Sequence, residues 1–161
     1  MRSTALAILF TFFVAAINTG CASTPLNYAD MTEIQVQDEK DLQQRIERTA
    51  QPIARIGMQF VDADKRGKLA AQIVELLESI ERTLVSTDAS GWQRELISQT
   101  AKHLTLLTPD IQEVAKDAFD LFNGWVNLPG LNDIIPDVIR DRLLAFIRGA
   151  VAGLKSVQTE G

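Results

Sequence analysis

The sequence of 161 residues contains one cysteine and one histidine. A single cysteine excludes a disulfide within the chain. A structural zinc site needs four cysteine or histidine ligands, and the H-E-x-x-H motif needs two histidines. One histidine and one cysteine therefore exclude both. Di-iron bundles are excluded as well, because they need a Glu-x-x-His pair on each of two helices. Neither a G-x-S-x-G elbow nor a glycine-rich phosphate loop is present. We therefore expect a protein that is not an enzyme and binds no metal or cofactor.

Basic residues are also in deficit, since 16 lysines and arginines stand against 21 aspartates and glutamates. The net charge of −5 argues against a nucleic-acid partner, because proteins bind nucleic acid through a clustered basic surface. Five prolines, nine glycines and a hydrophobic content of 46% are ordinary values for a globular protein. Collagen-like and wholly disordered chains are thereby excluded.

The first residues differ from the rest of the chain. Arg2 supplies one positive charge, and Ala5 to Ile17 then form an apolar run interrupted only by Thr11. A transmembrane helix needs about 20 apolar residues, so this run is too short to span a bilayer comfortably. A charged start, a short apolar core and small residues at its exit predict a secretory signal peptide.

The apolar run is followed by Asn18-Thr19-Gly20-Cys21. This segment resembles the lipobox of bacterial lipoproteins, in which small residues precede an invariant cysteine. The resemblance implies cleavage between Gly20 and Cys21, a diacylglycerol on the thiol of Cys21 and an acyl chain on its new amine. Thr19 and Gly20 match the pattern, whereas Asn18 replaces the aliphatic residue, usually leucine, at that position. Lipidation also explains why an exported chain keeps one unpaired cysteine.

The resemblance further implies a location in the cell envelope. Ala22 is not the aspartate that retains lipoproteins at the inner membrane of many Gram-negative cells, which favours the outer membrane, facing the periplasm. Several acyl chains on Cys21 satisfy the two-signal requirement for stable anchoring. Two alternatives remain open: cleavage after Ala22 would release a secreted protein, and an uncleaved segment would be an N-terminal anchor.

The sequence thus divides into three parts: a signal peptide over 1–20, the lipidated cysteine with a flexible tether over 21–37, and a helical domain over 38–158. Removing residues 1–20 takes away Arg2 and no acid, so the net charge becomes −6. The tether is assigned because residues 22–37 are polar and show no helical period.

From Asp38 onward apolar residues recur every three or four positions, which is the helical period. Five such segments predict an all-α bundle of about five amphipathic helices. The first apolar stripe contains Leu42, Ile46, Ile53, Ile56 and Phe60. The second contains Leu69, Ile73, Leu76, Leu77, Ile80 and Leu84. The last contains Ile135, Val138, Ile139, Leu143, Ile147, Ala150 and Leu154. The third and fourth helices are predicted over 90–107 and 108–125.

Four further predictions concern particular residues of these segments. Pro52 should kink or divide the first helix, because proline cannot donate the backbone hydrogen bond. Asn132 or Asp133 should cap the last helix, with Pro136 in its first turn. Glu75, Glu78 and Glu81 face solvent in the second helix rather than forming a cation site, and Glu78 pairs with Arg82. His103 is expected to be structural or exposed.

The last helix carries an edge of small residues, formed by Ala145, Gly149 and Gly153 at four-residue intervals. Such an edge lets another backbone approach closely. Because glycine costs about 1 kcal/mol relative to alanine inside a helix, two glycines indicate a packing requirement. Three interpretations are open: packing within the bundle, self-association, and contact with a membrane or an apolar ligand.

These observations predict a lipid-anchored envelope protein whose small helical domain has a non-catalytic interaction or scaffolding role. The expected partners are the membrane, reached through the lipid on Cys21, and an envelope protein or a second copy of the chain. The alternative is a carrier or sensor that holds an apolar ligand within the bundle.

Overall fold

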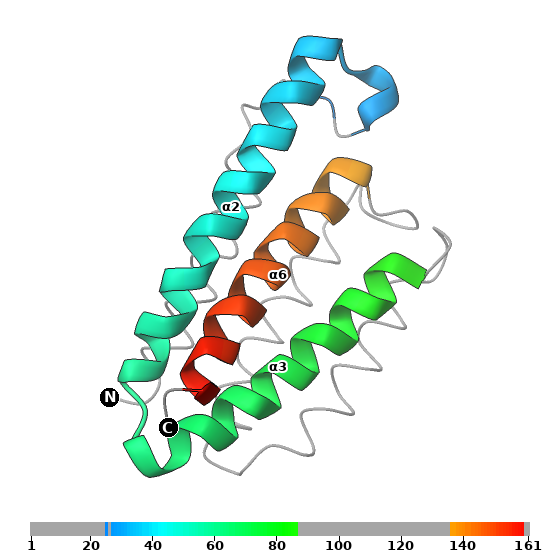
Figure 1. Cartoon of the computed structure of the whole chain (residues 1–161). Helices are drawn as coiled ribbons and strands as arrows, with labels where there is room; N and C mark the ends of the chain where they lie inside the picture. Colours follow the sequence, from blue (N-terminus) through cyan, green and yellow to red (C-terminus); the bar gives the residue numbers. More distant parts are fainter. Residues whose placement is uncertain (1–24, 26, 87–135, 160–161) are drawn as a thin grey trace.

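The computed structural model describes residue 25, residues 27–86 and residues 136–159. They form a short 3-10 helix, η1 (Tyr28–Asp30), and three long helices, α2 (Glu33–Gln59), α3 (Ala63–Ser86) and α6 (Asp137–Thr159) (Figure 1). No β-strand occurs in these ranges. The all-α prediction is confirmed. The helices predicted over 90–107 and 108–125 lie outside the described residues.

The three long helices lie side by side, with α6 between α2 and α3 (Figure 1). Helix α6 packs against both neighbours, whereas α2 and α3 have few direct contacts with each other. The chain runs in the same direction in α2 and α6 and in the opposite direction in α3. Because α2 ends at residue 59 and α6 begins at residue 137, the contacts between them join residues far apart in the sequence.

Helix α2 begins at Glu33, earlier than the predicted boundary at Asp38. A capping box starts it: the hydroxyl of Thr32 accepts a hydrogen bond from the backbone N–H of Gln35 (3.3 Å), and the side chain of Gln35 accepts one from the backbone N–H of Thr32 (2.9 Å). These bonds satisfy two donors that a helix start otherwise leaves without partners. Residues 33–37, which the sequence assigned to the flexible tether, are therefore helical.

Pro52 lies inside α2, which continues through it as one helix. Of the two effects predicted for Pro52, a kink or a division of the segment, division is therefore wrong. The proline is exposed, so the carbonyl group that loses its helical donor lies on the solvent side, where water can bind it. On the other side of the helix Ala50 and Ala54 are buried against Gly149 and Gly153 of α6.

The buried side of α2 differs from the predicted stripe. Ile46 is buried, but Ile56 and Phe60 are exposed over 51% and 57% of their surface. The other buried residues of α2, which the predicted stripe does not contain, are Glu39, Ala50, Ala54, Gly57 and Met58, and three of these five are alanine or glycine. A pattern of large apolar residues does not reveal this side of α2, because small residues are needed there for the close approach of α6.

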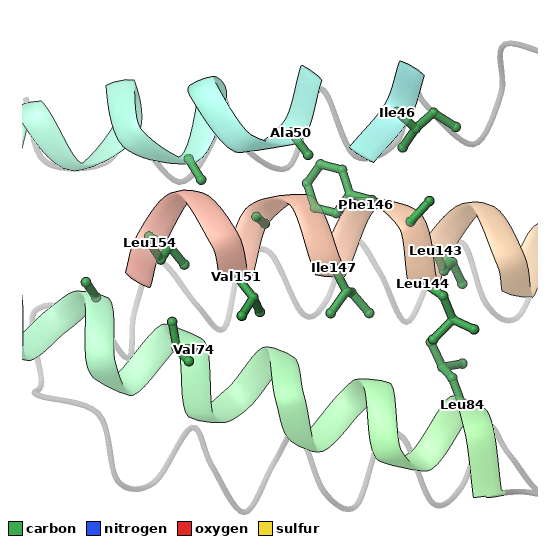
Figure 2. Packing of buried hydrophobic residues seen from close by; sticks show 14 of the residues in the cluster. Ile46, Ala50, Val74, Leu84, Leu143, Leu144, Phe146, Ile147, Val151 and Leu154 are labelled. Atoms are coloured by element: carbon green, nitrogen blue, oxygen red, sulfur yellow. The ribbon is translucent and has the colours of Figure 1, made fainter. Parts of the chain in front are cut away.

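The predicted stripes of the other two helices agree better with the structure. In α3, Leu69 and Leu84 are buried and the remaining members are half-buried, together with a buried Val74. Helix α6 is buried around most of its circumference (Figure 2). Its buried apolar residues are Val138, Ile139, Leu143, Leu144, Ala145, Phe146, Ile147, Ala150, Val151 and Leu154.

Helix α6 begins after Pro136 rather than including it, which corrects the predicted start. The carbonyl oxygen of Pro136 accepts a hydrogen bond from the N–H of Arg140 (3.0 Å), so the proline occupies the cap position, where its missing N–H costs nothing. Asn132 and Asp133 lie outside the described residues. None of the three long helices combines the length and the apolar character needed to cross a bilayer.

Candidate functional site

A buried ion pair joins α2 to α6. The guanidinium of Arg142 donates two hydrogen bonds to the carboxylate of Glu39, from Nε to Oε1 (2.8 Å) and from Nη2 to Oε2 (2.5 Å). The side chains are only 4% and 3% exposed. This fork-to-fork geometry is the strongest arrangement that arginine and a carboxylate can adopt.

The pair determines how α2 and α6 are placed more than it adds net stability. Removing two charges from water costs several kcal/mol per ion, and the attraction between them offsets that cost only when the geometry is good. Shifting α6 along α2 would leave both charges buried without each other. The Glu39–Arg142 pair therefore favours one register of the two helices over all others.

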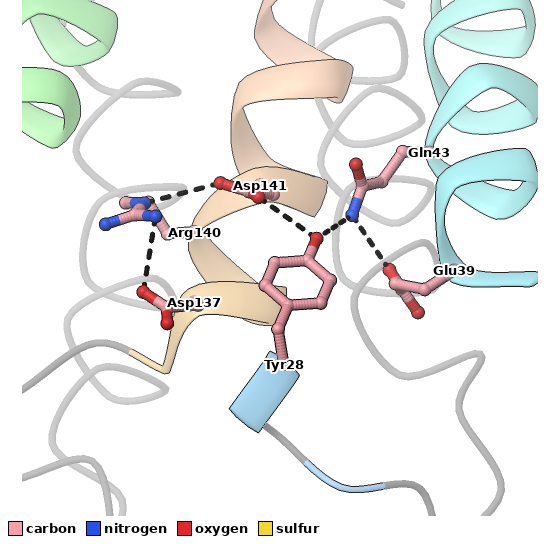
Figure 3. A network of polar contacts seen from close by, with 6 residues as sticks. All are labelled: Tyr28, Glu39, Gln43, Asp137, Arg140 and Asp141. Atoms are coloured by element: carbon pink, nitrogen blue, oxygen red, sulfur yellow. Dashed lines mark hydrogen bonds and ion pairs between the residues drawn. The ribbon is translucent and has the colours of Figure 1, made fainter. Parts of the chain in front are cut away.

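Tyr28 connects the N-terminal segment to both helices (Figure 3). Its hydroxyl donates to Oδ2 of Asp141 (3.0 Å) and accepts from Nε2 of Gln43 (2.6 Å). Gln43 also donates to Oε1 of Glu39 (3.2 Å), so the tyrosine and the ion pair share one network. We refer to Tyr28, Glu39, Gln43, Asp141 and Arg142 as the polar cluster.

The chemical character of Tyr28 follows from its surroundings. Burial raises the pKa of its hydroxyl to about 12, and the hydrogen bond to Asp141 and the negative charge of that residue act in the same direction. The amide of Gln43 opposes this change, because it donates to the phenolic oxygen. The hydroxyl thus stays protonated near neutral pH and serves as a hydrogen-bonding group that holds η1 against the bundle.

Around the polar cluster the ion pairs are more exposed. Arg140 lies 3.2 Å from Asp137 and 3.3 Å from Asp141 in this outer layer (Figure 3). Pairs as exposed as these contribute little to stability.

The small-residue edge of α6 faces α2 of the same chain. A Cβ atom on Gly149 would overlap the carbonyl oxygen of Glu47 and lie 2.9 Å from the Cβ of Ala50. A Cβ atom on Gly153 would overlap the carbonyl oxygen of Gln51 and lie 3.1 Å from the Cβ of Ala54. Ala145, one turn before Gly149, is buried too. Backbone contact with α2 thus occupies the edge that the sequence left open to several partners.

Two acidic residues of α3, Glu78 and Glu81, form ion pairs with α6. Glu78 lies 2.7 Å from Lys155, and Glu81 lies 2.8 Å from Arg148. The predicted pair of Glu78 with Arg82 is therefore wrong, because Glu78 pairs across the helix interface with Lys155 instead. Within the described ranges, no group of three or more potential ligands is placed to hold a metal ion.

None of the five residues of the polar cluster was identified as a candidate site residue from the sequence. Arg142 offered a signal, because it follows Val138 at the four-residue interval that also relates Ala145 to Gly149, which places a charge on a buried stripe. A charge at such a position requires a buried partner. The predicted cleavage and lipidation positions, Gly20 and Cys21, lie outside the described residues.

Comparison with known proteins adds no functional assignment. The chain matches no protein-family model, no curated protein and no solved structure.

Proposed function

We propose that the protein is a lipid-anchored component of the bacterial cell envelope, with Cys21 as the lipidated residue and the outer membrane as its site. One observation carries the proposal: the only cysteine follows a signal-like apolar run and precedes Tyr28 by seven positions. Tyr28 is bound to both α2 and α6, so the part of the chain next to the cysteine is joined to the helical domain.

The proposal has a geometric consequence. Seven residues span at most about 25 Å when fully extended, whereas the 27 residues of α2 extend over about 40 Å. A lipid on Cys21 would therefore keep the end of the domain that carries the polar cluster close to the membrane surface. The helical domain would extend into the periplasm from that end.

The proposed role is non-catalytic, in interaction or scaffolding. In the described part of the chain the buried charges are used in structural pairing, as Glu39 and Arg142 illustrate. Large apolar side chains are meanwhile exposed on α2 and α3, which offers contact surface to a partner. The backbone contact at Gly149 and Gly153 supports this role over the alternative of an apolar-ligand carrier, because α2 and α6 leave no space between them there.

We also propose that the complete bundle has about five helices. The apolar periodicities of 90–107 and 108–125 support this number, together with the capping signal at Thr108-Pro109-Asp110.

Metabolic labelling with a palmitate analogue tests the anchor. The full-length protein, expressed in a bacterial host, should incorporate the label and remain with the membranes after a high-pH wash. The Cys21→Ser variant should lose both properties while its precursor accumulates. Absence of label in the parent protein, or label that survives in Cys21→Ser, would contradict the proposal.

A further inference from the structure

A stripe of exposed residues runs along the second half of α2. Its members are Arg45, Arg48, Pro52, Ile56 and Phe60, and all five are exposed. Successive members are three or four positions apart, and residues at this spacing are neighbours on one side of a helix. From residue 45 to residue 60 the stripe extends over about 22 Å. We refer to these five residues as the outer stripe.

The two ends of the outer stripe differ in chemistry. Arg45 and Arg48 form a cationic end, and Ile56 and Phe60 lie in an apolar end, where they expose 51% and 57% of their surface. The stripe itself contains no acid. Asp41, the acid one turn before Arg45, accepts a hydrogen bond from within its own helix (3.0 Å). A complementary surface would therefore supply carboxylates at one end and apolar side chains at the other.

Backbone hydrogen bonds hold the apolar end in place where α2 turns into α3. The N–H of Phe60 donates to the carbonyl oxygen of Gly57 (3.3 Å), and the N–H of Val61 donates to the carbonyl oxygen of Met58 (3.1 Å). From α3, Nη2 of Arg66 donates to the carbonyl oxygen of Val61 (3.1 Å). Phe60 is thus presented in a defined position, which reduces the conformational entropy lost when a partner binds.

Pro52 is an independent indication that this side of α2 has a use. Inside a helix, proline removes the donor to the carbonyl oxygen four residues earlier, here that of Arg48, and so lowers stability. Packing within the chain does not require the proline, because its side chain is exposed. Residues that break a local rule without a structural gain are expected at functional sites.

We propose that the outer stripe binds a groove in another envelope protein, with carboxylates at one end of the groove and apolar side chains at the other. A single helix presents a convex ridge, and a ridge with anchors at three- and four-residue spacing fits a groove. Arginine and aromatic residues are enriched at protein interfaces. This surface gives the proposed interaction role a location and rests on that role, but it does not depend on the lipid.

Two other occupants fit the outer stripe less well. A second copy of the chain would require the stripe to complement itself, and the stripe has no acid to pair with its arginines. A bilayer surface favours a helix whose basic residues and apolar residues occupy different sides along its whole length. In the outer stripe they instead follow one another along a single side, which favours a protein groove.

Photocross-linking of the full-length protein, in the bacterium that encodes it, tests the location. Replacing Phe60 by the photoreactive amino acid benzoylphenylalanine should give an adduct with one other protein. The same replacement of Val85, which is exposed over 64% of its surface at the end of α3, should not. Equal yields, no adduct from Phe60, or an adduct with lipid or with a second copy of the chain would overturn the proposal. An adduct from Val85 alone would overturn this surface but leave the interaction role standing.

Charge substitutions test the chemistry of the partner in the same photoreactive background. Arg48→Glu should lower the adduct yield at least about tenfold, because it places like charges together. Arg48→Lys should retain the adduct, and Arg82→Glu, the same charge reversal at an exposed position of α3, should leave it unchanged. An undiminished yield in Arg48→Glu would overturn the acidic groove.

Two further variants identify the contacts. A carbodiimide joins amines to adjacent carboxylates, so in Arg48→Lys it should link residue 48 to an aspartate or glutamate of the same partner protein. Absence of this link, or a link to another protein, would overturn the acidic groove. Pro52→Ala should lower the adduct yield about threefold, since it removes apolar contact area, although it should raise the midpoint of thermal unfolding. An unchanged yield would overturn the place of Pro52 in the interface.

Discussion

Arg142 and Glu39 pair through two hydrogen bonds, of 2.8 and 2.5 Å, although 103 positions separate them in the sequence. The same pair of helices comes into backbone contact two turns further along, where Gly149 faces the carbonyl group of Glu47. Each contact fixes the position of α6 along α2 independently of the other. Together they explain how two parallel helices without a short connection reach one defined register.

Breaking the ion pair should destabilise the fold strongly. Glu39→Gln leaves the charge of Arg142 buried, so we expect a loss of about 3–5 kcal/mol in the free energy of unfolding. Denaturant unfolding of the full-length protein in detergent, followed by circular dichroism, measures this loss. Combining Glu39→Gln with Arg142→Met should cost less than the two single changes added together. Arg140→Gln, in an exposed pair, is the control and should change stability by about 0.5 kcal/mol or less.

Adding one methyl group at the helix contact should have an effect opposite to that of adding it at an exposed glycine. Gly149→Ala forces Cβ against the backbone of α2, and overpacking of this kind costs about 1–3 kcal/mol. Gly67 lies in α3. A methyl group added there would have no atom within 4 Å apart from its chain neighbours and the backbone of its own helix. Gly67→Ala should therefore stabilise the protein by about 0.5–1 kcal/mol. Equal effects at the two glycines, measured by denaturant unfolding, would contradict the close contact between α2 and α6.

Ionisation of Tyr28 should release the N-terminal segment at high pH. The pKa of Tyr28 is about 12 in the folded protein, above the ordinary value of 10.0, so folding favours the protonated hydroxyl. The contribution of this group to stability is therefore complete below pH 10.0 and is lost as the pH rises through about 12. Because Tyr28 is the only tyrosine, tyrosinate absorbance during a pH titration reports it directly. A midpoint that does not change when denaturant is added would speak against the hydrogen bonds of the polar cluster.

Replacing Pro52 should stabilise α2. Pro52→Ala restores the donor to the carbonyl group of Arg48 and relieves the ring contact, which inside a helix costs about 3 kcal/mol relative to alanine. Part of this gain is offset because alanine leaves the unfolded chain more freedom, so we expect a net stabilisation of about 1–2 kcal/mol. The midpoint of thermal unfolding should rise, whereas Ala71→Pro, at an exposed position in α3, should lower it.

Local patterns predicted part of the fold. The three- to four-residue spacing of large apolar residues predicted α3 and α6, because the helical period acts within a few residues of sequence. In α3 only Leu69 and Leu84 of the predicted stripe are buried, whereas all the described residues of the stripe predicted in α6 are buried. The same spacing wrongly predicted that Ile56 and Phe60 are buried. It also missed the capping box at Thr32 that starts this helix.

The site was less accessible to such reasoning. The small-residue edge of Ala145, Gly149 and Gly153 was visible in the sequence, but not the helix that would meet it. Arg142 stood on a buried stripe without an evident partner. Its partner, Glu39, lies between the end of the predicted tether at residue 37 and Leu42, the first residue of the predicted apolar stripe.

By itself the sequence determined the helical class, the positions at which backbone could approach backbone, and the N-terminal pattern that predicts a lipid on Cys21. The tertiary structure alone decided which side of α2 is buried and which acid accompanies Arg142. The physical reason is that helix formation depends on neighbours within one or two turns. Burial of a charge or an alanine of α2 depends instead on α6, which begins 78 positions after α2 ends, from residue 59 to residue 137.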